Sequence, residues 1–109
     1  MIIWKKEVLS LSVGTTQAIS SGEMMGRVEQ ILIQPLDSSG VLVSTSSWDV
    51  SITDRNGELI GFIDTQTGRY DWRAGLPVGS DRPDIVTFTF SSVTQTPATI
   101  RIMMKVLEK

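Results

Sequence analysis

Cysteine and histidine are both absent from this chain of 109 residues. Without cysteine there is no disulfide framework, no thiolate metal site and no cysteine nucleophile. Without histidine the chain lacks the usual general base, the commonest metal ligand and every Ser-His-Asp arrangement. These two absences remove most familiar catalytic and metal-binding constellations, and we expect no cofactor.

Clustered positive charge and long apolar runs are missing as well. Ten Lys and Arg residues stand against twelve Asp and Glu, a net charge of −2, and the basic residues are scattered. A phosphate backbone is bound by a clustered basic stripe, so we expect no nucleic-acid partner. No apolar run reaches the length of about 18 residues that spans a bilayer, so we expect no membrane segment.

The chain begins with the residues MIIWKKEVLSLSV, in which apolar residues precede the positive charges. A secretory signal peptide has the reverse order and a longer apolar core. We therefore expect a mature N-terminus and a chain made in a cytoplasm.

Charge is distributed unevenly along the chain. Residues 37–84 hold eight acids against four bases, whereas residues 85–109 hold three bases against one acid. In a β-sandwich, such asymmetry gives either a polar contact surface or an ordinary solvated face of loops.

Alternation of apolar and polar residues dominates the chain, and a period of two is the strand period. No stretch has a convincing helical stripe, since the best candidate, residues 20–32, has no capping box and is interrupted by Gly26. The inward positions of the alternating runs form the predicted core: Leu9, Leu11, Ile31, Ile33, Trp48, Val50, Ile52, Phe88, Phe90, Ile100, Ile102 and Met104.

Turn signals recur about every dozen residues between these runs, which is typical of an antiparallel sandwich or barrel. Pro35 should end its strand or place it at an edge, because proline donates no ladder hydrogen bond. The connections around 37–47 and 64–84 are too long for hairpin turns and suggest strands that cross between sheets. We predict one all-β domain over 1–109, an antiparallel β-sandwich of jelly-roll or Greek-key type.

The stretch from Ser46 to Phe62, SSWDVSITDRNGELIGF, contains a cluster of Asp, Asn and Glu residues. An EF-hand loop starting at Asp54 would need Gly at position 6 and Glu at position 12, but Gly57 is at position 4 and Thr65 at position 12. A hairpin accounts for the cluster better, because Asp bonds the backbone two residues on and Asn-Gly tolerates positive φ. We predict a tight reversal at Asn56-Gly57 and no metal site.

Other acidic residues leave a catalytic alternative open. Asp64, Asp71, Asp81 and Asp84 could supply a carboxylate pair of the glycosidase kind. A domain of this size has no second lobe to form a deep cleft, so we expect no enzyme activity.

The segment TGRYDWRAG, Thr67 to Gly75, contains residue types that are enriched in interface hot spots. Arg69, Tyr70, Trp72 and Arg73 are therefore candidate partner-binding residues. Alternatively, Tyr70 and Trp72 alternate inward along a short strand and cover the core.

Ile2, Ile3 and Trp4 pose the same choice at the N-terminus. Ile3 shares a parity with Leu9, whereas Trp4 falls on the opposite face of the strand. Either both faces of this strand are covered, or residues 1–6 form a contact arm. An apolar arm left in water is an aggregation hazard, so we expect these residues to be buried against a partner.

Three segments together resemble a group of small structural proteins of tailed-phage virions: RVEQILIQP, WDVSITDRNGELIG and TFTFSSVTQTPATIRIMM. In those proteins a strand that ends in proline precedes a hairpin of the form YDVTITDxxG, and two strands about a short polar loop close the chain. Here Trp48 stands in the place of the tyrosine, and residues 64–84 do not follow the pattern. The resemblance covers roughly residues 27–62 and 85–107.

This resemblance implies a structural virion protein, made in the host cytoplasm, that acts as a capsid decoration or cement protein or at the head–tail region. Its implied partner is the major capsid protein or another virion protein, bound as a homo-oligomer or on a lattice, and it implies no catalytic residue. Two rivals remain. One is a carbohydrate-binding or host-adhesion module that uses Trp48, Tyr70 and Trp72 as a stacking platform, and the other is a small hydrolase that uses the aspartates.

Overall fold

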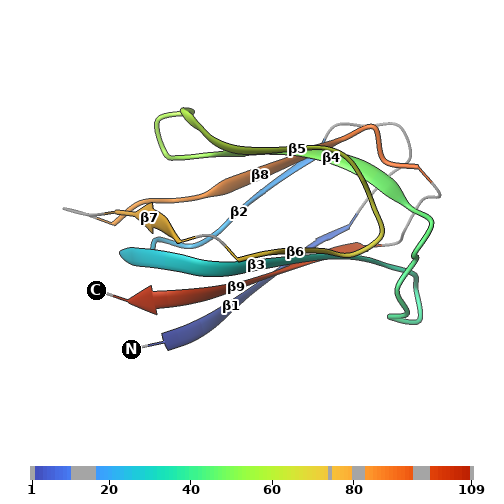
Figure 1. Ribbon diagram of the computed structural model, residues 1–109, viewed down its shortest axis with the longest axis horizontal. Coiled ribbons are helices and arrows are strands. Elements are labelled where there is room, and N and C mark those ends of the chain that lie inside the picture. Colours follow the sequence, from blue (N-terminus) through green and yellow to red (C-terminus); the bar gives the residue numbers. More distant parts are fainter. Residues whose placement is uncertain (1, 11–16, 74, 80–82, 95–98, 109) are drawn as a thin grey trace.

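Nine strands form two antiparallel sheets in the computed structural model, which describes residues 2–10, 17–73, 75–79, 83–94 and 99–108, with the backbone alone at residues 5, 7–10 and 65. The strands are β1 (Ile2–Ser10), β2 (Gln17–Ser20), β3 (Gly26–Leu36), β4 (Ser47–Thr53), β5 (Leu59–Thr67), β6 (Tyr70–Trp72), β7 (Leu76–Val78), β8 (Thr87–Ser91) and β9 (Thr99–Glu108). Sheet A has the order β1-β9-β3-β6, with β7 also paired to β3, and sheet B has the order β2-β8-β4-β5. The sheets lie one above the other (Figure 1). The described residues contain no helix, and the predicted all-β sandwich is confirmed.

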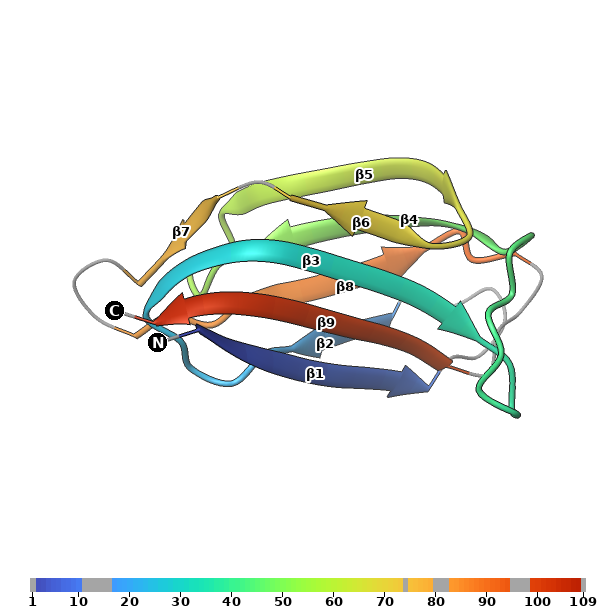
Figure 2. The same cartoon turned by 60° about the horizontal axis from the view of Figure 1, so that its bottom comes forward.

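The strand order is that of a jelly roll. Strands β6 and β7 pair with successive parts of one edge of β3, at residues 31–33 and 26–28, so they act as one interrupted strand (Figure 2). With β6 and β7 counted as one, each strand of the first half pairs with its counterpart in the second half: β1 with β9, β2 with β8, β3 with β6 and β7, and β4 with β5. This nested pairing, wound into two sheets, is the jelly-roll topology.

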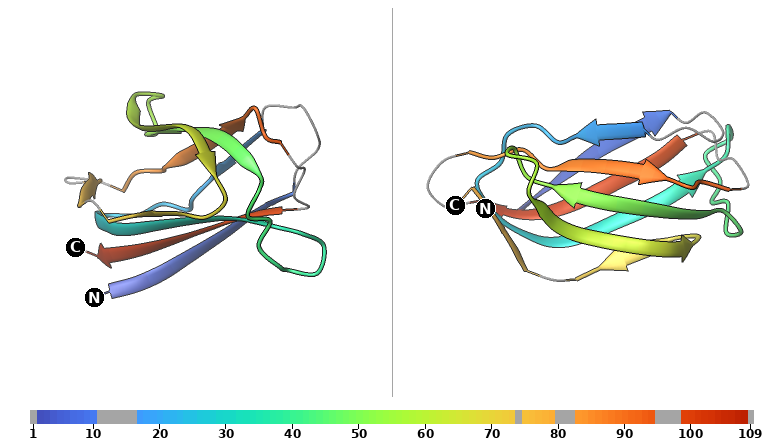
Figure 3. Two further views of the ribbon diagram at one scale, coloured as in Figure 1. Left: turned by 45° about the vertical axis from the view of Figure 1, so that its right-hand side comes forward. Right: turned by 90° about the horizontal axis from the view of Figure 1, so that it is seen from above.

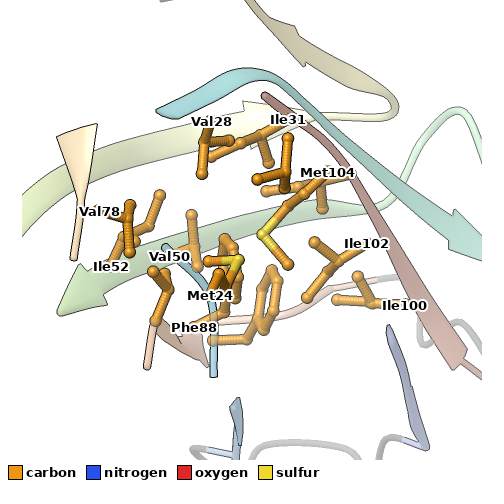
Figure 4. Close-up of a cluster of buried hydrophobic side chains, with 14 of the residues drawn as sticks. Met24, Val28, Ile31, Val50, Ile52, Val78, Phe88, Ile100, Ile102 and Met104 are labelled. Atoms are coloured by element: carbon orange, nitrogen blue, oxygen red, sulfur yellow. The ribbon is translucent and has the colours of Figure 1, made fainter. Parts of the chain in front are cut away.

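The core between the sheets is lined by the residues that alternation predicted (Figure 4). Ten of the twelve predicted core residues are at most 2% exposed: Ile31, Ile33, Trp48, Val50, Ile52, Phe88, Phe90, Ile100, Ile102 and Met104. Leu11 and the side chain of Leu9 lie outside the described residues. Six further apolar residues are buried that the prediction did not include: Met24, Val28, Leu36, Val78, Val86 and Val106.

Strand β1 is paired with β9 over its whole length, from Ile2 opposite Leu107 to Ser10 opposite Thr99. Residues 2–6 therefore belong to sheet A and are not an arm detached from the domain. Only one face of this strand is covered within the described chain, since Ile2 and Trp4 on the other face are 56% and 48% exposed. The two chain ends consequently lie at the same end of the sandwich (Figure 1).

Pro35 lies inside β3, one residue before its end, and pairs with Ile100 of β9. The Pro35 carbonyl accepts a hydrogen bond from the Val43 amide at 2.9 Å, on the side of β3 away from β9. The N–H and C=O of one strand residue point the same way, so the missing N–H of Pro35 also faces away from β9. The pairing of β6 with β3 ends at Ile33, so no neighbouring strand pairs with β3 on that side at Pro35. The missing N–H of Pro35 therefore breaks no hydrogen bond of the sheet.

The predicted reversal at Asn56-Gly57 is confirmed. Asp54 Oδ1 accepts hydrogen bonds from the amides of Asn56 and Glu58, both at 2.9 Å, and the Gly57 amide donates to the Asp54 carbonyl at 3.0 Å. Gly57 has φ +78°, a conformation that glycine adopts without steric cost. The turn joins β4 to β5, which pair directly.

The same turn occurs a second time, at the start of the connection from β3 to β4. Asp37 Oδ1 accepts from the amides of Ser39 and Val41 at 2.8 and 2.9 Å, and Gly40 has φ +81°. Both long connections cross between sheets, as predicted. The connection over 64–84 is not a simple loop, however, because it includes the end of β5 and strands β6 and β7.

Candidate interaction surfaces

The face of sheet A that points away from the core carries apolar and basic side chains. Ile2 and Trp4 of the edge strand β1 are 56% and 48% exposed. The register places them beside outward residues of β9 and β3, since directly paired residues share a face. We call the following set the basic face: Ile2, Trp4, Lys6, Leu32, Arg101, Met103, Lys105 and Leu107. Figure 2 turns this sheet toward the viewer.

Direct cross-strand pairs bring unlike side chains together on the basic face. Trp4 lies opposite Lys105, and Met103 lies between Lys6 of β1 and Leu32 of β3. Paired residues of this kind have Cβ atoms about 4.5–5.5 Å apart, so one partner molecule can contact several of them. Aromatic residues, Met and Arg are the residue types enriched in protein interfaces.

The positive charge of this face is not neutralised within the described part of the chain. At its margin Arg27 pairs with Glu29 at 3.2 Å and Arg73 with Asp71 at 3.3 Å. Arg101 instead donates from Nε and Nη2 to the neutral Gln34 Oε1, at 3.1 and 2.6 Å. Among the described residues, Lys6, Arg101 and Lys105 have no acidic partner.

The outward face of sheet B has the opposite charge. Leu59 and Phe62 of the edge strand β5 are 59% and 60% exposed, and Asp64 is exposed on the same strand. Strands β4 and β8 present mostly hydroxyl side chains outward: Ser47, Asp49, Ser51, Thr53, Thr87, Thr89 and Ser91. We call Asp49, Leu59, Phe62 and Asp64, together with the exposed Glu58 of the adjoining turn, the acidic face. No described residue of the four strands of sheet B, which Figure 3 shows from above, is basic.

A hollow opens at the edge of the sandwich where β5 and β6 face each other. It has a volume of about 310 Å³ and is lined by Ile60, Gly61, Phe62, Ile63, Tyr70 and Trp72. Tyr70 and Trp72 point inward and pack against the core while remaining partly exposed. The Trp72 indole packs closely over Gly61. A β-carbon added to Gly61 would lie 3.4 Å from two carbons of the Trp72 ring.

Trp48 is fully buried at the centre of the core. Its Nε1 donates to the Gly68 carbonyl at 3.0 Å, which ties the β5–β6 corner to the core. Its ring makes edge contacts with Phe90 and Tyr70, at centroid distances of 5.7 and 6.3 Å. Trp48 therefore cannot belong to the stacking platform that the carbohydrate-binding alternative required.

The predicted partner-binding residues of the N-terminus separate by parity. Ile2 and Trp4 lie on the exposed basic face, whereas Ile3 points inward and packs against the core. Sequence parity had already placed Trp4 and Ile3 on opposite faces of the strand. Because Ile3 packs against the core, the face that carries Trp4 points away from the core.

The second predicted group lies on the opposite edge of sheet A. Arg69 and Arg73 are exposed, and Tyr70 and Trp72 turn into the hollow along a short strand, which is the alternative that alternation had left open. Strands β9 and β3 separate this edge from β1, so the two predicted groups do not form one site.

The aspartates considered for catalysis lie on different elements. Asp64 is on β5 of sheet B and Asp71 on β6 of sheet A, while Asp84 accepts hydrogen bonds from the Arg55 and Ile85 amides at 3.0 and 2.7 Å. Asp81 lies outside the described residues. Within the described residues no three acidic side chains gather in a way that could hold a metal ion.

Asp71 is held in its ionised form. The Gln30 amide donates to Asp71 Oδ1 at 2.9 Å, and Arg73 donates to Oδ2 at 3.3 Å. The hydrogen bond from Gln30, followed by the hydrogen bond and positive charge of Arg73, lowers the pKa of Asp71 below its ordinary 3.8. A general acid needs a raised pKa, so this environment is the wrong one for that role.

The chain matches no protein-family model and no curated protein. Over the ranges that the structure describes, no helix is long and apolar enough to cross a membrane. The two exposed faces and the hollow are the features of the described structure that bear on function.

Several residues of these surfaces escaped the sequence prediction. Leu59 and Phe62 were not singled out, because bulges in the β4–β5 pairing shift the register and obscure which side of β5 faces out. Leu32 and Met103 could have been predicted from the sequence. Both are apolar residues that alternate with the apolar inward residues of their strands, so they must lie on the outward face.

Proposed function

We propose that this chain is a non-enzymatic structural component of a tailed-phage virion, where it binds and stabilises a capsid or head–tail assembly. The resemblance of residues 27–62 and 85–107 to small virion proteins supports the setting. Jelly rolls occur in viral capsid proteins, and also in lectins and cupins, so the fold is compatible with this role without assigning it.

The proposal rests on the exposure of Ile2 and Trp4 on the basic face. A half-exposed tryptophan on an edge strand, next to exposed isoleucine, is costly in water and attracts further strands or apolar surfaces. Trp is also the residue type that most often dominates binding energy at interfaces. A partner surface that covers β1 and the outward side of β9 removes this cost.

The mechanism is a clamp without chemistry. The chain bridges neighbouring subunits of the assembly and raises the free energy needed to separate them. Binding to a repeated surface is multivalent, so individually modest contacts suffice. A contact of about 800 Å² per partner is of ordinary size for a stable protein interface.

The test is retention of the chain on purified virions of the phage that encodes it. Trp4→Ala is expected to lose at least about 2 kcal/mol of binding free energy, roughly a 30-fold weaker affinity, if Trp4 is a central anchor. Val41→Ala is the control, because Val41 is an apolar residue that is 60% exposed but lies in the β3–β4 connection, on neither face. Circular dichroism checks that both variants fold.

Absence of the wild-type chain from washed, purified virions would refute the proposed function. Equal retention of Trp4→Ala and Val41→Ala, with both folded, would remove the basic face from the contact. Loss of the fold in Trp4→Ala is not expected, since the indole does not belong to the core cluster.

The hollow between β5 and β6 supports one alternative, a carbohydrate-binding or adhesion module. Tyr70, Trp72 and Phe62 line it, and aromatic rings with nearby polar groups are typical of small-ligand sites. Titration of the chain with glycans of the host envelope, followed by Trp fluorescence, tests this function. Saturable binding that Phe62→Ala abolishes would favour the adhesion module over the clamp.

A further inference from the structure

We infer that copies of this chain bind one another head to tail, with the basic face of one copy against the acidic face of the next. The two faces lie on the outer sides of the two sheets, so one molecule presents both at once (Figure 3). In the purified chain, away from any virion, the occupant of each face is thus a second copy of the same chain, through its other face.

Charge selects this pairing over a symmetric one. A two-fold contact between basic faces would bring Lys6, Arg101 and Lys105 of both copies together, and these residues have no acidic partner among the described residues. A two-fold contact between acidic faces would bring the carboxylates of Asp49, Glu58 and Asp64 of both copies together. Like charges across an interface are costly, whereas basic against acidic is complementary.

Apolar contacts complement the charges. The basic face exposes Ile2 and Trp4, and the acidic face exposes Leu59 and Phe62, each of them about half exposed or more. Each face thus combines large apolar side chains with an excess of one charge, since Asp71, opposite Leu32, is ion-paired with Arg73. This is the arrangement of an interface with an apolar centre and a polar rim.

The position of the two faces allows both to be occupied together. Strand β1 lies beside β2 at one edge of the sandwich, while β5 faces β6 at the other edge. The exposed apolar pairs therefore lie at diagonally opposite corners, and neither neighbour blocks the other. A contact between two different patches continues from copy to copy and gives a ring or a filament, whereas a two-fold contact stops at a dimer.

This contact needs no other protein, so it goes beyond the proposed virion role and can be tested on the purified chain alone. Sedimentation velocity over a concentration series is expected to show species larger than a dimer. High salt should weaken them, because mobile ions screen the charge contacts. A chain that stays monomeric at every concentration, or stops at a dimer, would overturn the inference.

Charge-reversed variants test the head-to-tail contact most directly. Lys105→Glu reverses one charge of the basic face, and Asp64→Lys reverses one of the acidic face. Each variant alone is expected to associate at least about tenfold more weakly, since it sets like charges against each other. Ser38→Glu, in the exposed turn that begins at Asp37, is the control for a change in net charge on neither face.

An equal mixture of the two charge-reversed variants is expected to regain association. The altered basic face of Lys105→Glu then meets the altered acidic face of Asp64→Lys, and the two remaining faces are both wild type. Failure of the mixture to recover, with both variants folded by circular dichroism, would contradict the head-to-tail contact. A chain that is monomeric in solution but retained on virions would overturn this inference and leave the proposed function standing.

Discussion

Gly68 is the position where the structure makes the sharpest prediction about stability. It has φ +70° at the corner between β5 and β6, where its carbonyl accepts the Trp48 Nε1 hydrogen bond and its amide donates to the Ser46 carbonyl at 2.7 Å. A β-carbon placed on Gly68 would lie 2.9 Å from the backbone oxygen of Ser44, closer than real β-carbons approach. Gly68→Ala must therefore move backbone on both sides of the corner.

The expected loss of stability has two parts. The left-handed conformation costs a non-glycine residue about 1–2 kcal/mol. Overpacking against a backbone atom that cannot rotate away adds about 1–3 kcal/mol. The sum, about 2–5 kcal/mol, is a large share of the roughly 5–15 kcal/mol by which such domains are stable. The melting temperature should fall by about 10 °C or more.

Gly57→Ala is the matched control for the conformational part. Gly57 has φ +78°, and a β-carbon there would meet no atom within 4 Å. It should cost about 1–2 kcal/mol from strain alone. Urea unfolding, followed by circular dichroism and Trp fluorescence, measures both variants. If Gly68→Ala is no less stable than Gly57→Ala, the close approach to Ser44 is not a constraint on this fold.

Three further predictions test parity, the turn and the one shifted carboxyl. Met104→Ala should cost about 2–5 kcal/mol in unfolding free energy, because Met104 is fully buried. Substitution of the neighbouring outward residue, Met103→Ala, should cost less than about 1 kcal/mol. Equal losses in the two variants would contradict the assignment of faces. Gly57→Val should cost about 1 kcal/mol or more, and calcium should not raise the melting temperature, whereas a saturable rise would indicate a metal site. The lowered pKa of Asp71 means that its ionised form stabilises the fold above about pH 3.8 and that this contribution is lost as the pH falls through the lower folded value. The melting-temperature difference between wild type and Asp71→Asn should therefore vanish in acid, and a titration midpoint of Asp71 above 3.8 by NMR would show the opposite environment.

Local pattern by itself determined the long alternating strands, most of the core and the turn at Asp54. In residues 86–90 every apolar side chain alternates with a polar one, and in residues 100–106 only Met103 breaks the alternation; a strand places such a set on one face. Asp54 and Gly57 specify their reversal within four residues, through a side-chain cap and a glycine in the left-handed region. These features depend on neighbours in the chain, so the sequence alone is enough to predict them.

Only the tertiary structure decided which surfaces are free. Trp4 is exposed because β1 is the outermost strand of sheet A, and Phe62 because β5 is the outermost strand of sheet B and reaches that position through bulged pairing. Tyr70 and Trp72 have the composition of an interface, yet they turn into the hollow because β6 adds to the edge of β3. In the sequence, Gly68 cannot be told from any other turn glycine. Only the fold places the Ser44 carbonyl against it. Sheet order and close approach arise from contacts between residues far apart in the chain, and alternation along a single strand carries no information about them.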